Sequence, residues 1–320
     1  MAVYTQVSDA QLAAFLGQYD IGRLVSCKGI AEGVENSNFL LQTEQGMFIL
    51  TLYEKRVAAH DLPFFIGLMD HLAHKGFVCP LPVRMKNGDA LGELSGRPAA
   101  IVTFLEGMGV KEPSADHCRM AGETLARLHL AGEEFAIRRK NALDPSGWRP
   151  LAQNAGARAD AVEPGLAALI ADEMAFHDAH WPTDLPTGVI HADFFKDNVF
   201  FLNDALSGVI DFYFACNDMF AYDLAITVNA WCFDGALRFE SDKAKAMIEG
   251  YQSVRMLGDA EKLAFGTLCR GAALRFLLTR LNDWLDVPTG ALVMPHDPKE
   301  FSERLRFFRD NSIDRLMGLV

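Results

Sequence analysis

The segment from Val189 to Asp211 constrains the fold most, because it places clustered polar residues among three short apolar runs. The runs "GVIH", "VFFL" and "GVIDF" are bounded by turn-forming residues, which predicts three short buried strands. The polar cluster "HADFFKDN" follows the first run, and the turn "NDALSG" separates the second run from the third. A hairpin of the second and third strands would bring Asn198 and Asp211 to one end.

Strand-like and helix-like patterns occupy different parts of the chain. The early part holds the β-like runs "RLVSCKGI", "SNFLLQT", "MFILTLY" and "PAAIVTFL", a helix that begins at a capping box of Ser8 and Gln11, and an Asn87-Gly88 hairpin turn. Helices are predicted over residues 61–75, 222–234, 241–256, 260–286 and 298–316. We therefore expect an α+β fold: a small antiparallel β-rich N-terminal lobe over residues 1–105 and a larger α-helical C-terminal lobe over residues 106–320.

The composition excludes several kinds of partner. The chain has 320 residues, of which half are hydrophobic, and a net charge of −12. A field of this sign repels the phosphates of nucleic acids and of membrane surfaces, so we expect neither as a partner. No apolar run is long enough to cross a bilayer, and the N-terminus lacks the regions of a signal peptide. These features predict a cytoplasmic protein whose six cysteines, which show no CxxC spacing, are reduced and buried.

The polar cluster has the spacing of a phosphoryl-transfer loop. His191, Asp193 and Asn198 fit the pattern H-x-D-x-x-x-x-N, and Asp211 follows at the end of the third short strand. Phosphoryl transfer needs a group that orients a hydroxyl and takes its proton, which suits Asp193. It also needs oxygen ligands that hold Mg²⁺ on the phosphates, which suits Asn198 and Asp211. A single aspartate would more simply form a turn, but the complete spacing favours the catalytic interpretation.

The motifs "HADFFKDN", "GVIDF" and "YDLA" resemble the aminoglycoside phosphotransferase and choline kinase branch of the protein-kinase-like fold. The stretches "GVENSNFLLQT", "FILTLYEK", "LPFFIGLMDHLAHKG" and "LRFLLTRLNDW" resemble more closely the bacterial homoserine kinases of that fold. This resemblance implies a two-lobed kinase fold with ATP and Mg²⁺ as cofactors. It also implies a small-molecule acceptor, L-homoserine, whose side-chain hydroxyl is phosphorylated in threonine biosynthesis.

The same resemblance implies roles for individual residues. Asp193 would be the catalytic base, and Asn198 and Asp211 would be the magnesium ligands. His191 and Asp223 would support the catalytic loop. The nucleotide would be bound by residues of the glycine loop, the third strand and the hinge: Gly29, Gly33, Thr51, Thr103, Phe104 and Leu105.

One position departs from the kinase pattern. Thr51 stands where the strand lysine of kinases is expected, and a threonine cannot pair with phosphates as a point charge. Lys28, Lys55 and Arg56 are the candidates to replace that charge, unless magnesium carries more of it. A non-catalytic pseudokinase is the alternative that this departure favours.

The acceptor is expected to be small. Only "FYFACNDMFAY" separates Asp211 from Asp223, so there is no room for a long activation segment or a peptide platform. An amino-acid acceptor needs a donor for its carboxylate, for which Arg275 and Arg280 are candidates, and Trp231 could wall the pocket. Choline, methylthioribose, an aminoglycoside and hydroxylysine remain alternative acceptors.

Overall fold

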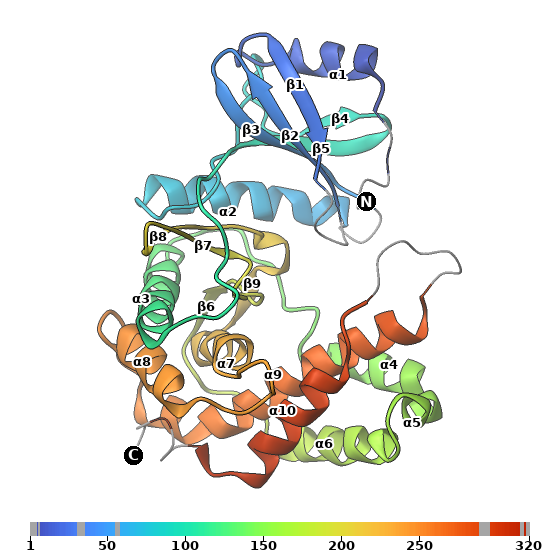
Figure 1. The fold of residues 1–320 in the computed structure, drawn as a ribbon, viewed down its shortest axis with the longest axis vertical. Coiled ribbons are helices and arrows are strands. Elements are labelled where there is room, and N and C mark those ends of the chain that lie inside the picture. The colour runs from blue at the N-terminus through green and yellow to red at the C-terminus, as the bar shows by residue number, and fades with distance from the viewer. Residues whose placement is uncertain are drawn as a thin grey trace. The chain divides into compact units, whose positions relative to one another are not determined.

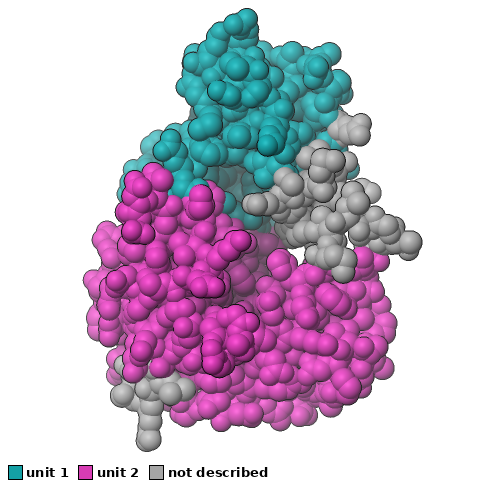
Figure 2. Space-filling model, viewed as in Figure 1, with its two compact units in different colours: residues 1–107, 135–137, 207–213 teal, residues 108–134, 138–206, 214–320 magenta. Residues whose placement is uncertain are grey.

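The computed structural model describes residues 5, 7–30, 36–54, 58–287, 295–313 and 317. The chain divides into two compact units, shown in different colours in Figure 2. The first unit comprises Met1–Gly107, Phe135–Ile137 and Ser207–Tyr213, and the second comprises Met108–Glu134, Arg138–Leu206 and Phe214–Val320. The first unit is rich in antiparallel strands and the second is mostly helical, which confirms the predicted α+β class.

A five-stranded antiparallel sheet organises the first unit (Figure 1). Its strands follow the order β1-β2-β3-β5-β4. Their bounds are β1 Leu24–Gly29, β2 Ser37–Thr43, β3 Gly46–Leu52, β4 Gly92–Leu94 and β5 Arg97–Thr103. The helices of this unit are α1 (Asp9–Leu16) and α2 (Leu62–His74), with a short 3-10 turn η1 (Ala59–Asp61) before α2.

Helix α1 begins at the predicted capping box. The Ser8 hydroxyl accepts the backbone N–H of Gln11, and the Gln11 side chain accepts the backbone N–H of Ser8. These bonds satisfy two N–H groups that the first turn would otherwise leave unpaired. The apolar side of α1 then packs on one face of the sheet in a core that includes Leu12, Phe15, Leu16, Leu41, Leu50, Leu52 and Ile101.

The hairpin of β4 and β5 turns at other residues than the predicted Asn87-Gly88. Asn87-Gly88 does form a turn, in which the Gly88 N–H donates to the Met85 carbonyl at 2.8 Å. The antiparallel pair, however, is closed by Ser95 and Gly96, whose φ angles are 54° and 72°. Two consecutive positive φ angles give the backbone twist that a two-residue hairpin needs.

Aromatic packing brings two later segments into the first unit. The Phe135 ring lies edge-on to Phe64 of α2, with ring centroids 5.4 Å apart. Tyr213 packs in the same way against Phe65 of α2 at 5.8 Å. The predicted N-terminal lobe of residues 1–105 did not include these segments, because contacts over such sequence separations leave no local pattern.

The second unit consists mainly of helices, with short strands beside them (Figure 1). The helices are α3 Ala115–Ala131, α4 Pro145–Ala155, α5 Ala159–Val162, α6 Leu166–His180, α7 Phe220–Trp231, α8 Ser241–Gln252, α9 Asp259–Leu285 and α10 Lys299–Asp310, with the 3-10 turn η2 Gly156–Arg158. Strand β6 (Thr187–Ile190) pairs antiparallel with β9 (Cys216–Met219). Strand β7 (Val199–Leu202) turns through Asn203 and Asp204 into β8 (Ala205–Val209), and η3 spans Phe212–Phe214. The end of β8 from Ser207 onward and the first two residues of η3 are assigned to the first unit.

Helix α7 is the centre of this unit. Every one of its residues is buried, and it packs against α3, α8 and α9. Helices α3 and α8 in turn meet backbone to backbone. A Cβ at Gly122 of α3 would lie 2.0 Å from the Met247 carbonyl oxygen, and one at Gly250 of α8 would lie 2.1 Å from that of Arg119. Only glycine permits so close an approach.

The predicted helices and cysteines agree with the structure in most places. Helix α9 matches the predicted residues 260–286, whereas α10 ends at Asp310 and not at 316. All six cysteines are free thiols, and five are buried. Cys27 is exposed on the edge strand β1, so the prediction of burial is wrong there. Within the described part of the chain, no helix combines the length and apolarity needed to cross a bilayer.

Replacing Gly250 by alanine should destabilise the protein, because the new methyl group would clash with the Arg119 carbonyl. Overpacking of this kind costs ~1–3 kcal/mol. The matched control is Gly266→Ala in α9, where the nearest atom to a new Cβ is 3.7 Å away and alanine should be neutral or stabilising. Thermal unfolding measures both. A Gly250→Ala variant as stable as Gly266→Ala would contradict the close helix contact.

Candidate active site

The predicted catalytic loop connects β6 to β7 within the second unit. Strand β6 holds its start, because Ile190 pairs with Cys216 of β9. His191 is fully buried, and Asp193 is half-buried. Between them, Ala192 adopts a left-handed conformation with φ of 61°, which is uncommon for a residue with a side chain.

Asp223 fixes this loop from the first turn of α7. One carboxylate oxygen accepts the N–H of His191 at 2.7 Å, and the other accepts the N–H of Ala192 at 2.8 Å. The side chain has no exposed surface. Support of the loop by Asp223 stays a prediction, and these two hydrogen bonds are the contacts on which it rests.

A histidine and a tyrosine complete the surroundings of Asp223. His129 of α3 lies with Nε2 3.0 Å from the Asp223 carboxylate and Nδ1 2.8 Å from the hydroxyl of Tyr251 in α8. Burial lowers the pKa of His129, so the ring is neutral. Burial opposes ionisation of Asp223, but the hydrogen bonds from His129 and from the His191 N–H hold its pKa below the usual range. Asp223 is therefore an ionised carboxylate that accepts three hydrogen bonds.

Asn198 orients Asp193. The Asn198 amide nitrogen donates to the Asp193 backbone carbonyl at 2.9 Å and to its carboxylate Oδ2 at 3.1 Å. The Asp193 N–H points at His191 Nδ1, 3.3 Å away. The Asn198 side-chain nitrogen donates both of its hydrogen bonds to Asp193, so the Asn198 side-chain oxygen stays available as an acceptor or metal ligand. The predicted base and one predicted magnesium ligand therefore lie together.

Two residues predicted to bind the acceptor lie behind the loop. Trp231 is fully buried, and its indole N–H donates to the Phe194 carbonyl at 2.8 Å. Arg275 is also buried and donates to the Ala192 carbonyl. Both side chains hold loop carbonyls, so neither offers surface to an acceptor here. Arg280 is paired with Glu300 of α10 at 2.7 Å.

The other predicted metal ligand, Asp211, belongs to the first unit. It is exposed and has φ of 63° at the end of β8. The hydroxyl groups of Tyr53 and Tyr213 lie 3.4 Å apart in the same unit. Burial raises the pKa of both tyrosines, and the negative charge of Asp211 adds to the effect. Asp211 therefore lies near two hydroxyl groups that stay protonated.

Thr51 makes a neutral contact where kinases carry a cation. Its hydroxyl donates to the Asn38 side-chain oxygen at 2.8 Å, and Thr51 is buried. Of the predicted hinge, Thr103 ends β5 and its hydroxyl accepts the Leu81 N–H at 2.9 Å, while Phe104 and Leu105 follow. Gly29 ends β1. Gly33, Lys55 and Arg56 lie outside the described residues.

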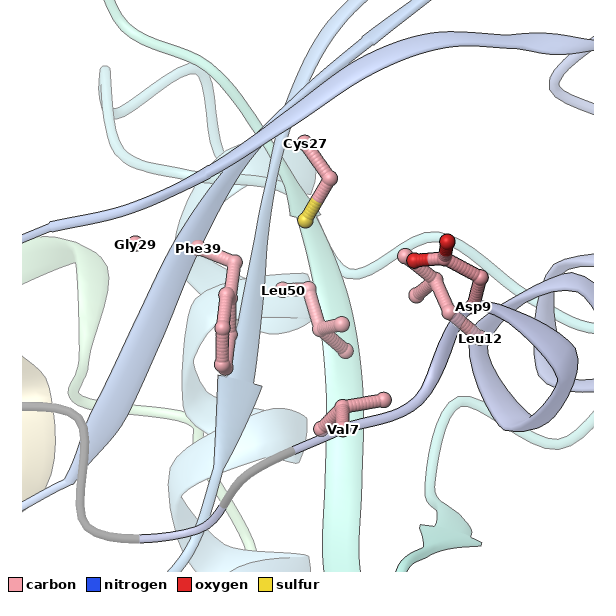
Figure 3. A pocket seen from close by; sticks show the side chains of 7 residues that line it. All are labelled: Val7, Asp9, Leu12, Cys27, Gly29, Phe39 and Leu50. Carbon is pink, nitrogen blue, oxygen red and sulfur yellow. The ribbon is translucent and has the colours of Figure 1, made fainter.

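The strand register assigns these residues to the two faces of the sheet. Thr51 is paired with Asn38, and Lys28 is paired with Leu40, two positions further along β2. Because side chains alternate between faces, Lys28 and Thr51 share one face. The opposite face, under α1, carries a cavity of about 210 Å³ (Figure 3). It is lined by Val7, Asp9, Leu12, Cys27, Gly29, Phe39 and Leu50.

Several groups of the site were not found from the sequence. His129 and Tyr251 support Asp223 from helices whose sequence separation from it hides the contact. A polar histidine between Leu128 and Leu130 of α3 is the only local signal for His129. No role was predicted for Asp218, to which the Asn141 amide donates a hydrogen bond at 2.7 Å. Burial raises the pKa of Asp218.

Comparison with known proteins agrees with this geometry. Residues 26–257 match the model of the phosphotransferase enzyme family. The homoserine kinase of Methylobacterium radiotolerans is 64% identical over 309 residues, which are 97% of this chain and 96% of that protein. The homoserine kinase of Azorhizobium caulinodans is 61% identical over 320 residues and the full length of both chains.

Solved structures show the same fold at low sequence identity. An amicoumacin kinase in complex with AMP-PNP and Ca²⁺ has a TM-score of 0.73 at 13% identity, covering 98% of this chain and 94% of that chain. A choline kinase from Cryptosporidium parvum has a TM-score of 0.67 at 13% identity, covering 95% of both chains. On the family match and on the identity to its relatives over their whole length, the chain belongs to the phosphotransferase enzyme family.

Proposed function

We propose that this phosphotransferase moves the γ-phosphoryl group of ATP to the side-chain hydroxyl of L-homoserine, giving O-phosphohomoserine and ADP. The choice of acceptor rests on the two relatives named homoserine kinase, which match the chain at 61–64% identity. The observation that carries the chemistry is the contact of the Asn198 amide with the Asp193 carboxylate. The product of such a reaction would serve threonine synthesis.

In this proposal Asp193 is the general base. The acceptor hydroxyl donates its hydrogen bond to the Asp193 carboxylate, which takes the proton as the oxygen attacks the γ-phosphorus and ADP leaves. Asn198 donates to one oxygen of that carboxylate, and we propose that the acceptor hydroxyl binds the same carboxylate. The buried contacts of Asp223 keep the backbone on which Asp193 stands in one conformation.

The residues also suit a magnesium ion. Mg²⁺ prefers carboxylate and amide oxygens and usually keeps several waters. The Asn198 oxygen receives no hydrogen bond from a described residue, and the Asp211 carboxylate is exposed. We propose these two as its protein ligands. When bound, the ion would neutralise the phosphate oxygens of the nucleotide and the charge that develops during transfer.

Lys28 is our candidate for the cation that Thr51 lacks. It lies on the same face of the sheet as Thr51, its side chain is exposed, and it has no ion pair with a described residue. Strands β1 and β2 are neighbours, and neighbouring strands are about 4.8 Å apart. A lysine side chain spans roughly 6 Å, so the Lys28 ammonium can extend from β1 over β2. It can therefore meet a phosphate bound over the Asn38–Thr51 pair.

A panel of acceptors tests the reaction, with ADP release as the readout. The panel contains L-homoserine, choline, methylthioribose, hydroxylysine and an aminoglycoside. We expect selective turnover of L-homoserine, and an Asp193→Asn variant should lose ~10²–10⁴-fold in kcat while still binding ATP. Asp204→Asn, in the exposed β7–β8 turn, is the matched control and should keep full activity. Turnover of a different acceptor would refute the substrate; ATP binding without turnover would support a pseudokinase.

The metal assignment predicts a loss of magnesium dependence. Asp211→Asn retains a residue that tolerates positive φ but weakens the ligand charge. Calorimetric titration of ATP with and without Mg²⁺ should show that the gain in affinity due to magnesium falls by about tenfold in the variant. An unchanged gain would remove Asp211 from the metal site.

The Lys28 assignment predicts a weaker nucleotide site. Lys28→Met should raise the KM for ATP by about tenfold, which corresponds to ~1.4 kcal/mol, and leave the KM for the acceptor unchanged. Arg23→Met is the control, because Arg23 is an exposed cation next to the same strand and pairs with Glu44 at 3.1 Å. Equal KM values for ATP in both variants would exclude Lys28.

A further inference from the structure

We propose that Arg275 is a positioning residue of the transfer reaction, which sets the backbone that carries Asp193, and that it does not bind the acceptor. This inference rests on the proposed role of Asp193 as the base. It goes beyond that role, because it assigns a function to a cation buried in helix α9. Three observations support it: the strained residue before Asp193, the contacts that hold that residue, and the absence of a counter-ion for Arg275 among the described residues.

The residue before the base needs outside support. Ala192 has φ of 61°, and a left-handed conformation is unfavourable for a residue with a side chain. The loop would therefore relax toward ordinary backbone angles if nothing held it. Such a change at Ala192 would reorient the next residue, Asp193.

The two peptide groups that flank the Ala192 Cα are held from different helices. The N–H before it donates to Asp223 of α7, and the carbonyl after it accepts from Nη1 of Arg275 in α9. The Ala192 carbonyl belongs to the same peptide plane as the Asp193 N–H. Arg275 therefore fixes the plane from which the Asp193 side chain extends, and Asp223 fixes the one before it.

Burial of the positive charge of Arg275 destabilises the folded protein. Only 2% of its surface is exposed, and no carboxylate of the described residues lies within ion-pair distance. Its guanidinium lies over the rings of Phe276 and Phe214, with 4.3 Å and 5.5 Å to the ring centroids. Its Nε has no hydrogen-bond partner in the part of the chain that the structure describes. A buried cation without a counter-ion destabilises the folded protein, and cation–π contacts offset this effect only in part.

An apolar side chain at position 275 would make the folded protein more stable than arginine does. The neighbouring residues Leu274, Leu277 and Leu278 of α9 are all fully buried. The contact that a methionine or leucine could not make is the one to the Ala192 carbonyl. We infer that this contact is the reason for the charge, and that the benefit appears in catalysis and not in folding.

The test compares Arg275→Met with Arg270→Met in the same helix. Arg275→Met should lower kcat by roughly 10–100-fold, with the KM values for L-homoserine and ATP within about threefold of wild type and Tm unchanged or higher. Arg270 instead pairs with the buried Glu173 at 2.7 Å and touches no loop atom in the described contacts. Its loss should lower Tm and leave kcat largely intact at low temperature.

Chemical rescue separates positioning from loss of structure. Arg275→Ala should regain part of its kcat when guanidinium ions are added at millimolar concentration, whereas urea, which is similar in shape but neutral, should not restore it. Arg275→Lys should fall between wild type and Arg275→Ala. The rescue of Arg275→Ala and the activity of Arg275→Lys keep the inference testable if Arg275→Met fails to fold.

Two results would overturn the inference. A large rise in the KM for the acceptor with kcat preserved would make Arg275 a binding residue, and an unchanged kcat would leave it no role in the reaction. If the proposed function is wrong, the wild-type enzyme itself will not turn over L-homoserine, which distinguishes that failure from a failure of the inference about Arg275. If wild type turns over another member of the acceptor panel and not L-homoserine, the same variants are measured with that acceptor.

Discussion

The architecture depends on one buried charge, the carboxylate of Asp223. A carboxylate taken out of water is stable only when donors replace its hydration, and here the donors are two loop N–H groups and His129. These bonds join the β6–β7 loop to α3 and α7. The geometry of the loop and the ionisation of Asp223 are therefore one constraint, because neither is stable without the other.

Buried helices hold the β6–β7 loop at several further points. Helix α7 is buried along its whole length, so the groups it sends toward the loop cannot be displaced by solvent. Trp231 at its end and Arg275 on α9 add donors to two further loop carbonyls. Rigid support behind a reactive group is the usual physical basis of preorganisation, and Asp193 is the proposed reactive group here.

Charge is distributed differently in the first unit. The Thr51–Asn38 pair is neutral, and the phosphate-binding cation of the kinase pattern is absent from β3. In a chain with a net charge of −12, attraction of a nucleotide needs local positive charge, for which the proposed magnesium ion and Lys28 are the candidates. Lys28 shares the face of Thr51, whereas Cys27 and Gly29 face α1 and the small cavity of Figure 3.

The sequence determined the class of fold, most helices, the capping box at Ser8 and the spacing of Asp193 and Asn198, because these follow from local periodicity and fixed offsets along the chain. Tertiary structure alone added His129 and Arg275 to the residues that hold the loop. His129 and Arg275 lie far from Asp223 and Ala192 in the sequence, and each reads locally as an ordinary helix residue. The sequence suggested Arg275 and Trp231 for the acceptor since it shows residue type but not burial. Burial and long-range pairing arise only when the helices pack.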